Sequence, residues 1–156
     1  VIRIHTRAPI TAPERVTPAL VEMLRARAPV WVIVHCNHPG ELSAPVLEGL
    51  SRLVDAGIPV LNQAVLLRGV NDDAAVLAQL CELLVEARVF PYYLHHTDAA
   101  AGNGAFRVGV EEGLAIYADL SQRVSGVALP RYVIDPPDGS GKIPVSEWAR
   151  RARPGR

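Results

Sequence analysis

The chain has 156 residues, 49% of them hydrophobic, with sixteen basic and sixteen acidic side chains and a formal net charge of zero. This composition suits one folded domain, and the balanced charge gives no overall field that would attract nucleic acid or an anionic membrane. There is no apolar run of about eighteen residues and no signal-peptide pattern, and the two cysteines, Cys36 and Cys81, are far apart. We therefore expect a cytoplasmic, reduced protein that binds neither nucleic acid nor membrane.

Strand-like and helix-like segments alternate along the whole chain. Val1 lies directly inside an apparent strand that reaches His5, which is how a fragment begins. Further apolar strands are predicted at residues 30–34, 60–67, 89–94 and 129–134. Helices are predicted after the Thr17–Pro18 pair, across residues 44–56, after a cap at Asn71 or Asp72, and across residues 110–124.

This repeated order of strand and helix, without a β-hairpin signal, is typical of βαβ units. Right-handed crossovers between such units produce a parallel sheet. A piece of a (β/α) barrel and an open doubly wound sheet both fit the pattern. We predict one domain over residues 1–146, followed by a basic, flexible tail at residues 147–156.

Polar residues gather directly after the predicted strands, at the ends where both architectures build their active sites. The segment 35–39, HCNHP, permits a metal site, because His and Cys are ligands of zinc and copper. Alternation along a strand separates His35 from Cys36, so a histidine that lines a ligand pocket, or a structural histidine, fits better. The polar clusters are His35/Asn37/His38, Arg68/Asn71/Asp72, His95/His96/Asp98 and the segment from Asp135 to Lys142.

Two carboxylates and one lysine stand out in the last two clusters. Asp98 ends the segment PYYLHHTD and is either a site residue or the cap of a loop. Asp135 ends a strand, and Lys142 follows in a loop rich in proline and glycine. Lys142 is the only lysine beside fifteen arginines, and a primary amine can bond covalently to a carbonyl cofactor where arginine cannot. The alternative is a solvated lysine or an imitation of a phosphate-binding loop, since the longer P-loop spacing is missing.

Five long strings, in this order, resemble one enzyme family: VIRIHTRAP, WVIVHCNHP, GIPVLNQAVLLRGVNDD, PYYLHHTD and YVIDPPDGSGKIPV. They are similar to the C-terminal portion of the lysine 2,3-aminomutases. The resemblance implies an α/β fold, a parallel-stranded partial (β/α) barrel of the radical SAM type. It also implies an isomerase that interconverts L-lysine and L-β-lysine with S-adenosylmethionine, a [4Fe–4S] cluster and pyridoxal phosphate (PLP).

The same resemblance assigns roles to the carboxylates and the lysine. Lys142 would hold PLP until the substrate displaces it, and Asp98 and Asp135 would bind the ε-ammonium group of the substrate lysine. Two carboxylates in one pocket repel each other unless a cation lies between them, which agrees with an ammonium ligand. Relatives that act on glutamate carry non-acidic residues at those two positions.

Only some of the residues that the family uses for S-adenosylmethionine and the [4Fe–4S] cluster have counterparts in this chain. His35 and Gln63 match positions that contact S-adenosylmethionine in the family, and His95 matches a nearby position that is tyrosine in some relatives. The CxxxCxxC motif that holds the cluster is absent, and Cys36 and Cys81 cannot replace it. We therefore expect no metal ligands in this chain and no activity from these residues alone. Activity is expected in the intact protein, as a homo-oligomer.

Other functions stay open at this point. A paralogue that prepares β-lysine for elongation factor P is similar, but it differs around the last strand. An aminomutase acting on another cationic amino acid, such as arginine, also fits. A truncated, non-catalytic binding module is the third alternative, although it would have no need of Lys142, Asp98 and Asp135. Asp138 and Ser140 interrupt a loop that is nearly all glycine in the family, which bears on how closely the backbone approaches a cofactor.

Overall fold

The computed structural model describes residues 1–27, 29–97, 102, 104–139 and 141–151. Strands and helices alternate as predicted, and short elements that we did not predict are added to them. The elements in chain order are β1 (Ile2–Thr6), α1 (Ala8–Thr11), η1 (Pro13–Arg15), α2 (Pro18–Arg25), β2 (Val30–His35), η2 (Pro39–Glu41), α3 (Ala44–Asp55), β3 (Val60–Val65), α4 (Ala74–Glu86), β4 (Phe90–His95), η3 (Gly104–Phe106), α5 (Val110–Arg123), β5 (Arg131–Ile134), β6 (Ile143–Pro144) and α6 (Val145–Arg151).

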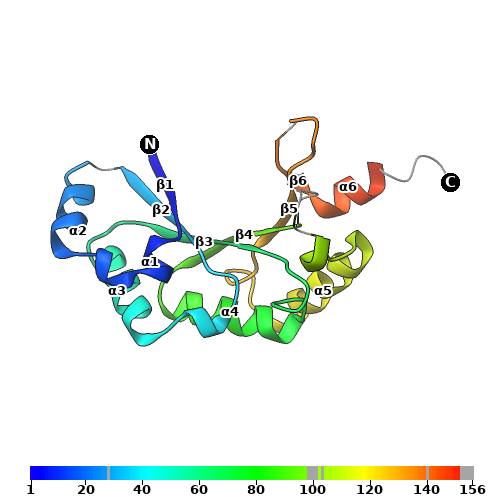
Figure 1. The fold of residues 1–156 in the computed structure, drawn as a ribbon, viewed down its shortest axis with the longest axis horizontal. Helices are drawn as coiled ribbons and strands as arrows, with labels where there is room; N and C mark the ends of the chain where they lie inside the picture. Colours follow the sequence, from blue (N-terminus) through cyan, green and yellow to red (C-terminus); the bar gives the residue numbers. More distant parts are fainter. Residues whose placement is uncertain (28, 98–101, 103, 140, 152–156) are drawn as a thin grey trace.

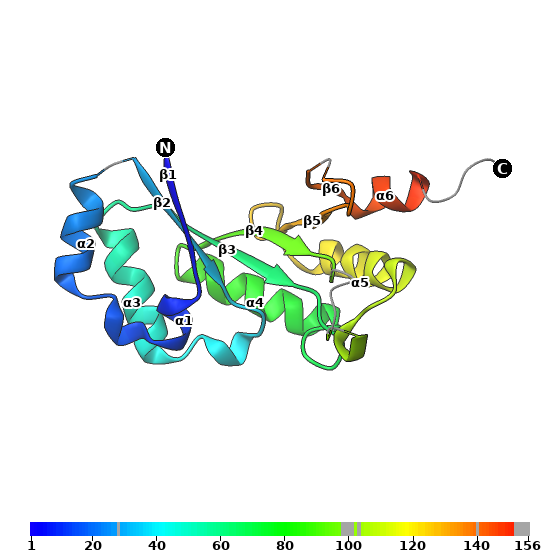
Figure 2. The same cartoon turned by 45° about the horizontal axis from the view of Figure 1, so that its top comes forward.

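The six strands form one sheet in sequence order, β1 to β6. The first five are parallel, and β6 is antiparallel to β5. Helices α2 to α5 lie along one face of the sheet, and no helix of the described residues covers the other face (Figures 1 and 2). A doubly wound sheet carries helices on both faces, whereas a (β/α) barrel carries them on its outside. The structure therefore confirms the α/β class and the parallel-stranded partial (β/α) barrel.

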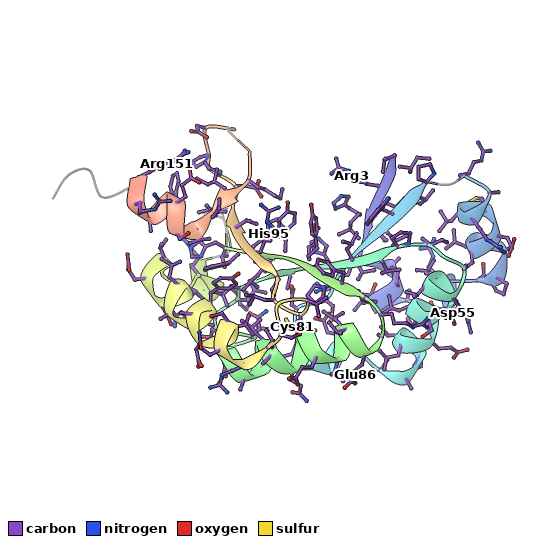
Figure 3. The ribbon with its side chains drawn as sticks, turned by 180° about the vertical axis from the view of Figure 1, so that it is seen from behind. Arg3, Asp55, Cys81, Glu86, His95 and Arg151 are labelled. Carbon is purple, nitrogen blue, oxygen red and sulfur yellow. The ribbon has the colours of Figure 1, made fainter. Side chains whose placement is uncertain are left out.

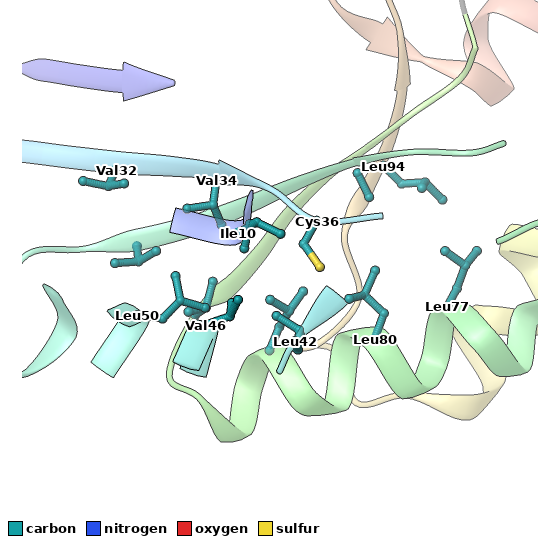
Figure 4. Close-up of a cluster of buried hydrophobic side chains, with 14 of the residues drawn as sticks. Ile10, Val32, Val34, Cys36, Leu42, Val46, Leu50, Leu77, Leu80 and Leu94 are labelled. Atoms are coloured by element: carbon teal, nitrogen blue, oxygen red, sulfur yellow. The ribbon is translucent and has the colours of Figure 1, made fainter. Parts of the chain in front are cut away.

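The hydrophobic core lies between the sheet and helices α3 and α4 (Figure 4). Val34 of β2, Leu50 of α3 and Leu84 of α4 have no exposed surface, and Leu80 is 2% exposed. Burial of one such side chain contributes about 1.5–3 kcal/mol to stability. The core thus fixes one face of each strand against the helices and turns the alternate residues of each strand toward the uncovered face.

The start of α4 differs from its prediction by one or two residues. Asp73 is the cap, since its carboxylate accepts a hydrogen bond of 2.6 Å from the N–H of Ala75. Asn71 and Asp72 instead accept hydrogen bonds from the turn before the helix. The cap predicted for α2 is confirmed, because the Thr17 hydroxyl accepts from the N–H of Leu20 at 3.2 Å.

Residues 147–151, which we expected in a flexible tail, belong to α6. Val145 at the start of this helix is fully buried, and Trp148 is half-buried. The helix packs against α5 and β5. An apolar side with helical spacing therefore anchors this segment despite its basic end, and residues 152–156 lie outside the described residues.

Gly113 allows α5 to approach β5 closely. A Cβ atom at this position would overlap the Tyr132 hydroxyl group and lie 3.2 Å from a methyl carbon of Leu66. Tyr132 is 5% exposed, and its hydroxyl hydrogen-bonds to Nδ1 of His96 at 2.7 Å, so it has little room to move. We expect Gly113→Ala to lower the free energy of unfolding by about 1–3 kcal/mol, because overpacking outweighs the gain in helix propensity of about 1 kcal/mol.

Thermal or urea unfolding of the purified intact protein measures this effect. Gly126→Ala is the matched control, since no atom lies within 4 Å of a Cβ at that position. Equal stabilities of the Gly113→Ala variant and the parent would contradict this expectation, because overpacking would then cost no more than the gain in helix propensity.

Candidate active site

The C-terminal ends of the parallel strands bring the predicted site residues to one edge of the sheet. His35, Gln63 and His95 lie at the ends of β2, β3 and β4, and Asp135 directly follows β5. Figure 3 shows His95 on the face of the sheet that points away from Cys81 of α4. Asp98 lies outside the described residues. The other five predicted residues form two groups of contacting side chains, His35 with Gln63 and His95 with Asp135 and Lys142.

The first group is the hydrogen-bonded pair of His35 and Gln63, which are direct register partners on β2 and β3. The Gln63 amide N–H donates to Nε2 of His35. An amide nitrogen can only donate, so this contact suits the tautomer in which Nε2 carries no proton. Burial, followed by the positive charges of Arg7 and His5, lowers the pKa of His35. Both facts describe a neutral histidine, which can bind a polar ligand without adding charge.

The lowered pKa of His35 predicts that the protein loses stability at acidic pH. As the pH falls, the unfolded chain takes up the proton of His35 first, because its pKa there is the ordinary 6.5. The stability associated with neutral His35 is therefore complete above about pH 6.5 and is lost as the pH falls through the lowered pKa. We expect the parent to lose stability relative to His35→Gln over this range. Urea midpoints of both proteins between pH 8 and pH 5 test this, and a constant difference would contradict it.

The second group consists of His95, Asp135 and Lys142. Oδ1 of Asp135 lies 3.2 Å from Nζ of Lys142, and Oδ2 lies 3.5 Å from Nδ1 of His95. The side chains of Asp135 and Lys142 are 42% and 40% exposed, whereas that of His95 is only 16% exposed. The group therefore combines a fixed imidazole with a carboxylate and a primary amine that a ligand can reach.

Strand pairing explains why these three residues meet. In the β4–β5 pair, His95 lies opposite Val133, two residues before Asp135 on the same face. In the β5–β6 pair, Ile134 lies opposite Ile143, so the antiparallel register places Asp135 next to Lys142. The two-residue strand β6, which the sequence did not reveal to us, thus positions the only lysine.

The loop between Asp135 and Lys142 keeps glycine where the backbone requires it. Gly139 and Gly141 have φ values of +74° and +85°, a conformation that other residues rarely adopt. The N–H of Gly139 donates to the carbonyl of Pro136 at 3.1 Å and closes the turn. Asp138 interrupts the glycine run but lies outside these two positions, so the interruption does not remove the turn that presents Lys142.

Three asparagines that we had not assigned as a group hold the strand ends together. Asn62 exchanges two hydrogen bonds with the backbone of Cys36, at 2.9 and 3.0 Å. The side chain of Asn37 accepts from the N–H of Val65, and that of Asn71 donates to the carbonyls of Asn37 and Val65. All three are at most 9% exposed. Asn62, an amide inside the apolar run of β3, was the signal in the sequence, because a buried amide requires partners.

The two cysteines are packing residues. Burial is the main cause that raises the pKa of both Cys36 and Cys81 to about 12. Their thiols are therefore protonated at neutral pH, whereas metal ligands are thiolates. Among the residues that the structure describes, no group of three or more His, Cys, Asp or Glu side chains could hold a metal ion. No helix in this part of the chain is long and apolar enough to cross a membrane.

The fold of this sheet recurs in a larger protein of known structure. A radical SAM methyltransferase from Sphaerobacter thermophilus superimposes with a TM-score of 0.55, over 85% of this chain and 40% of the other, at 22% sequence identity. This likeness shows a shared fold, that of part of a larger (β/α) protein. No protein-family model matches the chain.

The sequence relationship is more specific. The chain is 46% identical over 144 residues to the L-lysine 2,3-aminomutase of Methanococcus maripaludis, and 43% identical over 145 residues to that of Clostridium subterminale. These matches cover 92% and 93% of the chain, but only 33% and 35% of the relatives. The glutamate 2,3-aminomutase of Clostridioides difficile is 38% identical over 144 residues. Nearly the whole chain is thus homologous to a segment that makes up about a third of the length of each of these L-lysine 2,3-aminomutases. This homology confirms the resemblance.

Proposed function

We propose that this chain is part of an L-lysine 2,3-aminomutase, in which it supplies the lysine for PLP and a carboxylate for the substrate. The observation that carries the proposal is the pair of Asp135 and Lys142 at the exposed strand ends. Support also comes from identities of 42–46% to seven proteins named as established or putative L-lysine 2,3-aminomutases, against 38% to the glutamate enzyme.

The surroundings of Lys142 fit PLP. Its side chain is 40% exposed at the edge of the uncovered face, in a turn that has glycine at positions 139 and 141. The neighbouring Asp135 holds this amine toward the site through an ion pair of 3.2 Å. When bound, PLP supplies the electron delocalisation that migration of an amino group requires. Lys142 would bind it, and Asp135 would orient the amine before binding.

The pair of His35 and Gln63 fits S-adenosylmethionine. A neutral imidazole and a primary amide offer donors and acceptors to a polar ligand without electrostatic repulsion of its sulfonium. His95 lies at the end of the neighbouring strand β4. The buried, protonated Cys36 and Cys81 do not fit a [4Fe–4S] cluster, so we place the ligands of the cluster outside these 156 residues.

The charge of the site favours a cationic substrate. The Asp135 carboxylate lies beside a primary ammonium, that of Lys142, which is the same chemical group as the ε-ammonium of free lysine. While Lys142 holds PLP, its amine would no longer be an ammonium partner of Asp135, and Oδ1 of this carboxylate would be available to the substrate. Asp98, which lies outside the described residues, would be the second carboxylate. A glutamate side chain would be repelled by both.

The proposal extends to the setting of the intact protein. We place it in the cytoplasm, because its two cysteines are free and buried, as is usual in a reducing compartment. We also propose that it is a homo-oligomer with L-lysine as its small-molecule substrate.

A comparison of substrates tests the proposed function. The intact protein, reconstituted without oxygen with S-adenosylmethionine, iron, sulfide, PLP and a reductant, is incubated with lysine, arginine or glutamate. We expect β-lysine from lysine and at least about tenfold less product from the other two. If only arginine gives product, arginine replaces lysine as the proposed substrate. If none of the three amino acids gives product, the non-catalytic binding module is favoured.

A further inference from the structure

His95 is a fixed neighbour of the carboxylate that we assign to the substrate. We infer that His95 is a positioning residue that orients Asp135, and through it the ammonium group of the substrate, rather than a contact of S-adenosylmethionine. This inference rests on the proposed function. It assigns to His95 a role that differs from the one implied by the sequence resemblance.

The two oxygens of Asp135 have different partners. Nδ1 of His95 lies 3.5 Å from Oδ2, and Nζ of Lys142 lies 3.2 Å from Oδ1. A carboxylate that is held at one oxygen cannot rotate freely about its Cβ–Cγ bond. When the amine of Lys142 no longer contacts Asp135, His95 keeps Oδ2 in place. Oδ1 then stays directed at the position that the Lys142 ammonium had occupied.

The surroundings of His95 make it suited to this task. Its ring lies edge-on to the ring of Tyr93, with centroids 5.5 Å apart and planes at 65°. Its backbone carbonyl accepts from the N–H of Leu66 at 2.9 Å, and the next residue, His96, donates to the carbonyl of Val133 at 2.7 Å. His95 is thus attached to both neighbouring strands, whereas Asp135 is in the exposed loop. The orienting group is more rigid than the group that it orients.

An imidazole also leaves the charge of Asp135 available. A neutral histidine can donate from Nδ1 and still leave a full negative charge for the substrate. A lysine or arginine at position 95 would donate equally well, but would compete with the substrate ammonium for the carboxylate. The residue type therefore matches a donor that aligns Asp135 without neutralising it.

Two substitutions separate the polar contact of His95 with Asp135 from packing. His95→Phe keeps a ring against Tyr93 but removes the N–H. His95→Asn loses the ring but places its amide nitrogen close to the position of Nδ1. We expect His95→Phe to raise both Kd and KM for L-lysine about tenfold, with the Kd for S-adenosylmethionine unchanged, and His95→Asn to restore most of the affinity for lysine. Calorimetric titration of the reconstituted intact protein with each ligand measures both Kd values.

A double variant tests whether His95 acts through Asp135. In an Asp135→Asn background, His95→Phe should have little further effect on lysine binding, because the group that it orients is already altered. Weaker binding of S-adenosylmethionine in His95→Phe, additive effects in the double variant, failure of His95→Asn to restore affinity, or unchanged lysine binding would each overturn the inference. A parent protein that binds no lysine would overturn the proposed function itself, and this inference with it.

Discussion

Replacement of Lys142 by alanine is expected to abolish covalent retention of PLP by the intact protein. Lys142 is the only lysine of the chain, and its amine is held at the exposed edge of the site by Asp135. No other side chain in these 156 residues is a primary amine that can bond to the cofactor. After treatment with borohydride, mass spectrometry should find the cofactor on the peptide that contains Lys142 in the parent, and only background labelling of this segment in the variant.

Lys142→Arg is the matched control for charge. Arginine keeps a cation beside Asp135, but its guanidinium does not form the covalent bond. We expect this variant to fold as the parent does and to retain no cofactor. Labelling of the parent at some other peptide, or equal labelling of Lys142→Ala, would show that Lys142 does not hold PLP.

Asp135→Asn is expected to lower kcat/KM for lysine by about 10–100-fold, mainly through a higher KM. A hydrogen bond to a charged group contributes about 1.5–3 kcal/mol, and the variant keeps the shape of the side chain while it removes the charge. Steady-state kinetics with L-lysine measure the effect. The binding of S-adenosylmethionine should stay unchanged, because Asp135 contacts Lys142 and His95 rather than the pair of His35 and Gln63.

Asp55→Asn is the control for this substitution. Asp55 forms an ion pair of 2.6 Å with Arg88, and both side chains are more than half exposed. Exposed pairs contribute little, so we expect kinetics within about twofold of the parent. Equal effects of the two substitutions, or an unchanged KM in Asp135→Asn, would show that Asp135 does not bind the substrate.

The sequence alone was sufficient to predict the five parallel strands β1 to β5 and the helices α2 to α5. The nearly continuous β-branched run of β2 and the helical spacing in α4 are strong local signals, because most residues of β2 are buried and α4 buries one face. The cap at Asp73 was missed, since three polar residues in a row, 71 to 73, each suit a cap and only the backbone selects among them.

The partners within the site were harder to predict. We expected Asp135 and Lys142 in one site, but their direct contact depends on β6, which is too short to produce a pattern in the sequence. We expected His95 beside S-adenosylmethionine, and the structure brings it within 3.5 Å of Asp135. Both contacts depend on strand register, which is a property of paired strands and not of any one segment.

The most direct test of the central claim follows the amino nitrogen itself. L-lysine labelled with ¹⁵N at the α-amino group is incubated with the reconstituted intact protein, and the position of the label in the product is read by nuclear magnetic resonance. An aminomutase should yield β-lysine with the ¹⁵N on carbon 3. Release of the label as ammonium, or lysine that keeps all its label on carbon 2, would contradict the assignment.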